Sequence, residues 1–312
     1  MSLVTAKEVA KAIQLDRYGP LGTAVSWALM RLTRMSSINR VYETYKDLPG
    51  PEFLDAILSH YEIDFEIPEE DYKRLPKEGA YITISNHPLG GIDGILLLKL
   101  LLARRPDYKI IANFLLQRIG PLSPYILPVN PFENHRDVKS SVLGFKRAME
   151  HLGAGHPLGI FPAGEVSTYK DGKLIVDKPW EEAAVKLIRK SGVPVVPIYF
   201  HARNSRLFYR LSRMNEMLRT AKLPSELATQ HSRSIKVRIG QPISPEVQQE
   251  QKTLEEFTDL LRRKTYMLAN AYQKERLIDQ IPTSIKIPKP PRKIASAVRT
   301  EVIEGEIVKL RE

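Results

Sequence analysis

The sequence feature that most constrains the fold is the stretch 81–103, where a short β-branched and aromatic run leads through a glycine-rich turn into a long apolar run. Residues 81–85 are typical of a buried strand, and residues 92–103 indicate a helix. The turn places His87 where the strand ends and Asp93 in the first turn of the helix. In open α/β sheets, ligands bind at this end of the strands. The stretch therefore predicts a strand–turn–helix unit that carries a functional site.

His87 and Asp93 are the residues of this unit that could perform chemistry. Gly90 and Gly91 allow the backbone between them to take conformations closed to other residues, so the imidazole and the carboxylate can face each other. A carboxylate on one ring nitrogen fixes the tautomer and raises the basicity of the other nitrogen. The pattern favours a general base. The structural alternative is a histidine that caps a helix in a tight strand-to-helix turn.

Strand-like and helical segments alternate along the rest of the chain. Further strand-like runs lie at 109–113, 125–129, 157–161, 193–199 and 235–239. Helices are predicted at 5–16, 20–36, 53–61, 203–222 and 252–277. This alternation predicts an α/β fold with a mixed, mainly parallel sheet flanked by helices, preceded by N-terminal helices.

The composition limits the class of protein. A chain of 312 residues can form one large domain with appendages, and we divide it into an N-terminal helical segment (1–50), a main domain (51–278) and a Pro-rich basic linker and tail (279–312). The absence of cysteine excludes a disulfide framework and a thiol nucleophile. The net charge of +11 indicates an anionic partner, either nucleic acid or the negative face of a membrane.

Two segments are candidates for membrane contact. In the predicted helix 20–36, apolar residues recur as a stripe beside Trp27. In residues 203–222, an apolar face is surrounded by basic residues that include Arg206, Arg210 and Arg213. A basic amphipathic helix of this kind is typical of a membrane-surface segment, although it could instead pack its apolar face on the core. No uninterrupted apolar run reaches about 18 residues, so we expect peripheral binding without a transmembrane span.

Three blocks of sequence together resemble the glycerolipid acyltransferase family, also called the PlsC-like or lysophospholipid acyltransferase family. The pair Asn86-His87 followed by Asp93 is similar to the first family motif. Residues 158–167 (L-G-I-F-P-A-G-E-V-S) resemble the third motif, and residues 193–200 (V-P-V-V-P-I-Y-F) resemble the fourth. Five residues separate His87 from Asp93, where the family usually has four. This spacing resembles the bacterial haemolysin-like and amino-acid-lipid O-acyltransferases.

The resemblance implies an O-acyltransferase in which His87, supported by Asp93, deprotonates an acceptor hydroxyl that attacks a thioester. The donor would be acyl carrier protein (acyl-ACP) or acyl-CoA, which is a co-substrate, and we expect no bound cofactor and no metal. The acceptor would be a lyso-lipid, and the subgroup suggests a hydroxyacylated amino-acid lipid. The enzyme would act at the cytoplasmic face of the inner membrane. The substrate-binding residues implied by the motifs are Asn86, Gly90, Gly91, Phe161, Pro162, Gly164, Glu165 and Ser167.

Arg136 lies beyond the blurred second motif and could bind an anion, although a solvated loop is the alternative for it. The third motif departs from the family pattern F-P-E-G-T-R-S, because Ala163 and Val166 replace its Glu and Arg and Glu165 replaces its Thr. Arginine is suited to bidentate phosphate binding, so its loss argues against a lysophosphatidate acceptor. Glu165 could bind donor groups of the acceptor or lock the turn. A 1-acylglycerol-3-phosphate acyltransferase of phospholipid synthesis is the alternative function.

Two other classes of protein are weaker alternatives. A metal-dependent hydrolase built on His87 and Asp93 would need clustered ligands, and the other histidines show no ligand spacing. A nucleic-acid binder is suggested by charge alone, because the sequence has no helix-turn-helix, aromatic platform or zinc motif. We therefore expect a lipid partner and no nucleic acid.

Overall fold

The computed structural model describes residues 3–12, 14–129, 138–170, 174–214, 216–229 and 234–271. Arg136 and the predicted linker and tail at 279–312 lie outside these residues.

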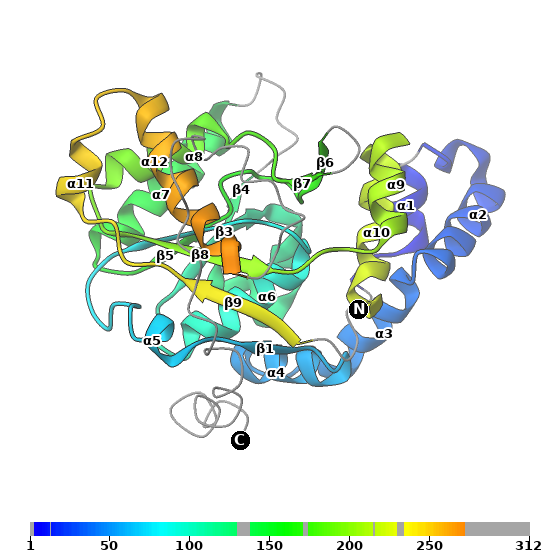
Figure 1. Cartoon of the computed structure of the whole chain (residues 1–312). Coiled ribbons are helices and arrows are strands. Elements are labelled where there is room, and N and C mark those ends of the chain that lie inside the picture. Colours follow the sequence, from blue (N-terminus) through cyan, green and yellow to red (C-terminus); the bar gives the residue numbers. More distant parts are fainter. Residues whose placement is uncertain are drawn as a thin grey trace.

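Seven strands of the described chain form one sheet in the order β1-β9-β8-β2-β5-β3-β4 (Figure 1). Their bounds are β1 Asp64–Glu66, β2 Ile82–Ser85, β3 Lys109–Asn113, β4 Ile126–Val129, β5 Leu158–Ile160, β8 Val195–His201 and β9 Ser234–Ile239. Every neighbouring pair is parallel except β8 and β9. Ile82 in the central strand β2 pairs with Leu158 on one side and Val195 on the other. The predicted mixed, mainly parallel sheet is confirmed.

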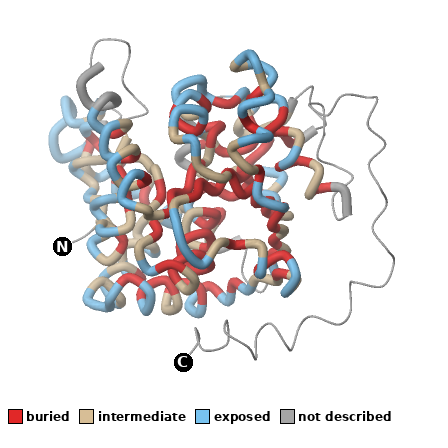
Figure 2. Tube along the Cα trace, turned by 90° about the vertical axis from the view of Figure 1, so that its left-hand side faces the viewer, coloured by how far each residue is buried: buried red, intermediate tan, exposed pale blue. Residues whose placement is uncertain are grey.

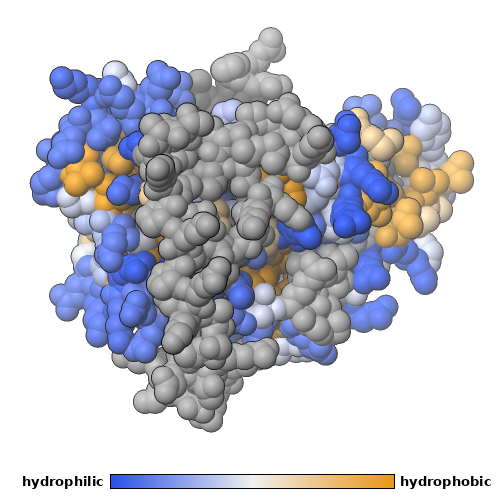
Figure 3. Space-filling view, in the orientation of Figure 1, coloured by the Kyte–Doolittle hydropathy of each residue, from blue (hydrophilic) through white to orange (hydrophobic). Residues whose placement is uncertain are grey.

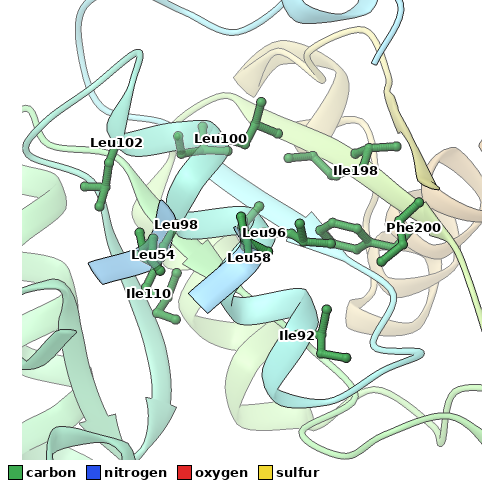
Figure 4. Close-up of a cluster of buried hydrophobic side chains, with 14 of the residues drawn as sticks. Leu54, Leu58, Ile92, Leu96, Leu98, Leu100, Leu102, Ile110, Ile198 and Phe200 are labelled. Carbon is green, nitrogen blue, oxygen red and sulfur yellow. The ribbon is translucent and has the colours of Figure 1, made fainter. Parts of the chain in front are cut away.

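Helices cover both faces of this sheet. The cluster on one face brings together α4 (Gly50–His60), α6 (Gly91–Leu102) and inward-pointing strand residues (Figure 4). The cluster on the other face is formed by α7 (Val138–Gly153), α8 (Glu182–Ser191) and α12 (Leu254–Tyr266). Buried residues concentrate at the centre, and the outer helices keep exposed surfaces (Figure 2).

The period-two alternation of β8 explains how one strand serves both clusters. Val196, Ile198 and Phe200 belong to the first cluster, whereas Val195 and Tyr199 belong to the second. All five side chains are fully buried. This burial on both faces explains why the strand reads as an almost continuous apolar run in the sequence.

The N-terminal segment contains α1 (Ala6–Ala12), the short 3-10 helix η1 (Asp16–Tyr18), α2 (Gly19–Leu32) and α3 (Met35–Tyr45). The sequence predicted one helix at 20–36, whereas α2 ends at Leu32 and α3 begins at Met35. The break follows from Arg34, whose φ of 59° is left-handed and cannot continue a right-handed helix. Val41 of α3 joins the core cluster that contains α4, so this segment packs on the main body.

The basic segment predicted as one helix at 203–222 is two helices, α9 (Arg206–Met214) and α10 (Glu216–Thr229). The first begins after Ser205, whose Oγ accepts the N–H of Phe208 at 3.1 Å and so caps the helix. The remaining elements are α5 (Glu69–Tyr72), the antiparallel pair β6 (Thr168–Lys170) and β7 (Leu174–Val176), α11 (Pro245–Gln249), and the 3-10 helices η2 (Phe114–Arg118), η3 (Gly120–Tyr125) and η4 (Met267–Ala271).

Candidate active site

His87 lies in the loop between β2 and α6, at the carboxyl end of the central strand. Its Nδ1 atom is 3.1 Å from Oδ2 of Asp93, which is in the first turn of α6. This is an ion-pair distance, although the ring nitrogen is not aligned for a hydrogen bond. Catalytic hydrogen bonds are often poorly aligned without substrate and tighten when substrate binds. The fold therefore brings together the two residues predicted as catalytic.

The His87 side chain reaches solvent, whereas the Asp93 side chain does not. The Asp93 side chain is fully buried, whereas the His87 side chain keeps 17% of its surface exposed. A reactant could therefore reach the imidazole from solvent while Asp93 stays protected from water. Low local polarity strengthens the electrostatic effect of a buried carboxylate on its neighbour.

Asp93 also holds the turn that carries the histidine. Its Oδ2 atom accepts the backbone N–H groups of Leu89 at 2.7 Å and Gly90 at 3.1 Å. Gly90 has a φ of +80°, and a Cβ there would lie 3.2 Å from side-chain atoms of Leu223 and Val166. The positive φ therefore favours glycine at position 90, and any larger side chain would also have to displace these two neighbours slightly.

The neighbours of His87 fix its position from two sides. The Phe161 ring lies with its centroid 4.3 Å from that of the His87 ring, at an interplanar angle of 34°. Asn86 is fully buried and exchanges two hydrogen bonds with Phe200 in β8, donating to its carbonyl at 3.0 Å and accepting its N–H at 2.8 Å. The side chain of Asn86 thus joins the loop to the adjacent strand. Its predicted contact with substrate stays a prediction.

Asp177 is a buried carboxylate at the site that sequence reasoning missed. One of its oxygens accepts the backbone N–H of His87 at 3.4 Å and the hydroxyl of Ser167. Its other oxygen accepts the hydroxyl of Tyr266. Burial, and then the negative Asp177, raises the pKa of Tyr266 well above its usual value, so this hydroxyl remains a donor. Asp177 therefore connects the histidine loop with the predicted third motif and with the end of α12.

The third-motif loop lies directly beside the histidine loop. The N–H of Ser167 donates to the carbonyl of His87 at 2.9 Å. Gly164 has a φ of +65° and donates to the carbonyl of Phe161 at 2.9 Å, which closes the turn. The carbonyl of Pro162 accepts the N–H of Glu181 at 2.8 Å. Of the loop residues predicted to bind substrate, Phe161 and Ser167 thus contact His87 directly.

The two apolar replacements in this loop point inward. Ala163 is 1% exposed and packs in the cluster that contains α12. Val166 is 6% exposed and packs with Ile175, Phe208 and Tyr209. The charged end of an arginine at position 166 could not stay in this apolar cluster. With valine at that position, the loop has no cation there.

Glu165 accepts two cations on one oxygen atom. The Nη2 of Arg219 and the Nζ of Lys178 each lie 2.7 Å from its Oε2. Burial opposes ionisation of Glu165, but the hydrogen bonds from Lys178 and Arg219 outweigh it and lower the pKa below its usual value. Glu165 is therefore ionised near neutral pH, and it joins the third-motif loop to α10 and to the segment after β7. Its predicted contact with the acceptor stays a prediction.

The helix pair α9–α10 is seated on the histidine loop. Nδ2 of Asn204, just before α9, donates to the carbonyl of Pro88 at 3.0 Å. Leu223 in α10 faces Gly90. Glu226 accepts both the N–H and the hydroxyl of Ser205, at 2.6 and 2.8 Å, which fixes α10 against the start of α9. The basic segment therefore packs against the histidine loop.

The same segment and α2 carry exposed apolar side chains. In α2 the predicted stripe faces outward, with Leu21 68%, Val25 48% and Leu32 82% exposed, and Trp27 is 53% exposed. Leu207 and Met214 of α9 are also exposed, as are Arg206, Arg210 and Arg213. Hydrophobic surface gathers over the N-terminal helices at the right of Figure 3, with hydrophilic surface beside it. The stripe is therefore not used to pack on the core.

Within the described ranges, no helix is both long and apolar enough to cross a membrane. In the same part of the chain, no group of three or more His, Cys, Asp or Glu side chains is arranged to hold a metal ion.

Comparison with known proteins identifies the class. The family model described as Acyltransferase matches residues 7–275, and the chain belongs to this acyltransferase family. The chain is 28% identical over 250 residues to the lyso-glycine lipid O-acyltransferase of Bacteroides thetaiotaomicron, covering 77% of this chain and 88% of that protein. It is 26% identical over 274 residues to the lyso-glycine lipid O-acyltransferase of Phocaeicola vulgatus, covering 85% and 95%.

Among solved structures, the chain is similar to the 1-acyl-sn-glycerophosphate (LPA) acyltransferase PlsC from Thermotoga maritima. The TM-score is 0.43 at 16% identity, covering 83% of this chain and 91% of that chain. The acyltransferase recognised from the Asn-His and Asp pattern is confirmed by the family match.

Proposed function

We propose that this protein transfers a fatty acyl group from the thioester of acyl-ACP or acyl-CoA to the hydroxyl of a lyso-lipid. The acceptor is a hydroxyacylated amino-acid lipid. The observation that carries the proposal is the contact of His87 with the buried Asp93 at the carboxyl end of β2. The likeness to two lyso-glycine lipid O-acyltransferases along most of their length supports the choice of acceptor.

His87 is the general base of the proposed reaction. Nδ1 faces Asp93, so Nε2 is the nitrogen that takes the proton from the acceptor hydroxyl. The hydroxyl oxygen attacks the thioester carbon, the carbon–sulfur bond breaks, and the thiolate of CoA or of the carrier protein leaves and takes up the proton. Asp93 stabilises the imidazolium that exists between these proton transfers. The reaction needs no protein nucleophile.

The apolar replacements in the third motif support an acceptor other than lysophosphatidate. Ala163 and Val166 are buried in apolar clusters. Neither can act as the bidentate phosphate ligand that an arginine in this loop would provide. An amino-acid lipid presents an amide and a carboxylate and has no phosphate for such a ligand to hold.

The acceptor carries a long acyl chain, so the proposed enzyme works at a membrane surface. The exposed apolar stripe of α2 and the arginines of α9 are suited to the interface, with apolar side chains among the acyl chains and cations at anionic head groups. We assign the protein to the cytoplasmic face of the inner membrane as a peripheral enzyme, where both thioester donors are available.

The experiment that tests the proposal compares two acceptors with the purified protein. An N-(3-hydroxyacyl)glycine and a lysophosphatidate of equal acyl length are supplied with acyl-ACP or with acyl-CoA, and ester formation is measured by mass spectrometry. We expect saturable acylation of the glycine lipid and weak acylation of lysophosphatidate. Efficient, saturable turnover of lysophosphatidate alone would contradict the proposal and favour the phospholipid enzyme.

A further inference from the structure

The geometry points to a subsite for the acceptor carboxylate formed by Arg219 and Lys178. This inference rests on the proposed function, because an N-acylated amino acid keeps one free carboxylate. Arg219 and Lys178 come from α10 and from the segment after β7, and both converge on Oε2 of Glu165 at 2.7 Å. Both side chains are cationic N–H donors, which suits a carboxylate ligand.

The cation pair belongs to the neighbourhood of His87. Lys178 directly follows Asp177, whose carboxylate accepts the N–H of His87. Glu165 lies two residues before Ser167, whose N–H donates to the carbonyl of His87 at 2.9 Å. Lys178 and Glu165 thus each lie within two residues of a group that is hydrogen-bonded to the backbone of His87.

Helix α10, which carries Arg219, also lies against the histidine loop. Leu223, one helical turn after Arg219, contacts Gly90 in the histidine loop. The fixing of Glu226 to Ser205 holds the helix in place on the other side. The helix that carries Arg219 is therefore packed against the loop that carries His87.

The three charged side chains differ in their exposure to solvent. Arg219 keeps 9% of its side-chain surface exposed, whereas Lys178 keeps 33% and Glu165 keeps 41%. A guanidinium carries five N–H donors in a planar fork that matches a carboxylate, so one bond to Glu165 leaves donors for a ligand. Burial of this fork makes its charge more effective than that of a surface arginine.

The arginine that is missing from the third motif has a counterpart in this subsite, which is Arg219. Val166 removes the arginine that the family pattern has in the loop, and Arg219 brings a guanidinium to the neighbouring residue from an element 54 positions away. Glu165 holds the two cations beside the histidine loop when the site is empty. The acceptor carboxylate then binds to the donors that remain.

The test compares an N-(3-hydroxyacyl)glycine with its carboxamide analogue, which has the same chain and hydroxyl but no negative charge. We expect the wild-type kcat/KM to favour the carboxylate by about tenfold or more, because hydrogen bonds to charged groups are the stronger ones. Arg219→Gln should raise the KM for the carboxylate acceptor about tenfold, abolish the preference over the carboxamide and leave the KM for the thioester unchanged. Arg219→Lys should retain part of the preference.

Lys178→Gln should reduce the same preference and carries the test if Arg219→Gln does not fold, as judged by thermal unfolding. Lys186→Gln is the matched control, since Lys186 forms an exposed pair with Glu182 in α8, on the other face of the sheet. Unchanged carboxylate preference in folded Arg219→Gln or Lys178→Gln overturns the inference. A raised KM for the thioester alone overturns it in favour of a donor phosphate site. Failure of the wild type to acylate either acceptor contradicts the proposed function itself.

Discussion

The carboxylate of Asp177 lies 3.4 Å from the backbone nitrogen of His87, which precedes it by 90 residues. The same carboxylate accepts the hydroxyls of Ser167 and Tyr266, so three segments meet at one buried group. A buried carboxylate is stable only when its oxygens are satisfied by such donors. The position of His87 therefore depends on residues far from the Asn-His pair in the sequence.

Asp177→Asn should lower both stability and turnover. The amide keeps one acceptor oxygen but presents an N–H₂ group to hydroxyls that now lack a partner, and unsatisfied buried groups cost about 1–3 kcal/mol. We expect a reduced free energy of unfolding, and a kcat lowered roughly tenfold at a nearly unchanged KM because the base is misplaced. Chemical denaturation and steady-state kinetics measure both effects. Asp47→Asn, at an exposed position, is the matched control. Wild-type kcat in Asp177→Asn would show that the contact does not position His87.

Asp93 has an electrostatic role and a structural role that two variants can separate. Asp93→Asn retains an oxygen for the N–H groups of Leu89 and Gly90 but loses the charge that stabilises the imidazolium. We expect kcat to fall by roughly 10²-fold or more with a modest loss of stability. Asp93→Ala should show the same kinetic loss and a larger loss of stability, because it removes the cap as well. Kinetics and thermal unfolding of both variants measure the two effects. Near wild-type turnover in Asp93→Asn would limit Asp93 to holding the turn.

Six of the seven strands of the main sheet were predictable from the apolar residues that they bury. The seventh, β1, was not predicted, because it is three residues long and has no fully buried residue. The proximity of His87 to Asp93 was predictable because both residues lie in one local unit, β2 to α6. Asp177 was not, since its neighbours Val176 and Lys178 give no pattern and its partners come from distant segments. Arg219 appeared in the sequence only as one arginine among several in a basic helix. Its contact with Glu165 depends on how α10 packs, which sequence spacing does not encode.

The break between α2 and α3 was missed for a related reason. Arg34 adopts a left-handed conformation that is usually marked by glycine or asparagine, so the sequence carries no stop signal there. The apolar stripe of α2 was recognised, but its outward orientation follows from tertiary packing, which buries Gly22, Ser26 and Met30 instead.

A charged cluster away from the site predicts a pH-dependent stability. Arg105 donates two hydrogen bonds to Asp107, at 2.8 and 2.7 Å, and also bonds the carbonyls of Gly79 and Gly155. The Arg105 bonds lower the pKa of Asp107 to about 2, although burial opposes this, and His156 adds a further contact. A lowered folded-state pKa stabilises the protein above the ordinary value of 3.8, and this contribution is lost as pH falls through about 2.

Asp107→Asn should therefore lower Tm by about 1–3 °C at neutral pH, since partly exposed pairs contribute little. The difference from wild type should shrink as pH falls from about 5 towards 2. Thermal unfolding across this range checks the trend. A constant difference down to the lowest pH at which the protein remains folded would mean that the charge of Asp107 is not what matters.

Membrane contact predicts a salt-dependent association with anionic vesicles, because screening weakens exposed charges. Changing Arg206, Arg210 and Arg213 together to Gln should weaken cosedimentation by tenfold or more, since each basic residue near an anionic leaflet contributes about 1 kcal/mol. The apparent KM for lipid acceptor should rise while turnover at saturation stays nearly unchanged. Leu21→Ser with Leu32→Ser should weaken binding without altering its dependence on salt.

The control for the vesicle experiment is Lys146→Gln with Lys186→Gln, which removes exposed charge from α7 and α8. This pair should leave vesicle binding close to wild type. If the arginine triple change leaves cosedimentation unaffected, those side chains do not contact the membrane. The lipid acceptor would then reach the active site without their help.

The general-base role of His87 is the central claim, and the turnover of purified His87→Ala tests it most directly. The side chain is partly exposed and its backbone contacts remain, so the variant should unfold at nearly the wild-type temperature. Acyl transfer from thioester to lyso-lipid should fall by about 10²–10⁴-fold with little change in KM. A folded His87→Ala protein that retains more than about a tenth of wild-type turnover would contradict the account, because general-base catalysis is worth at least that much.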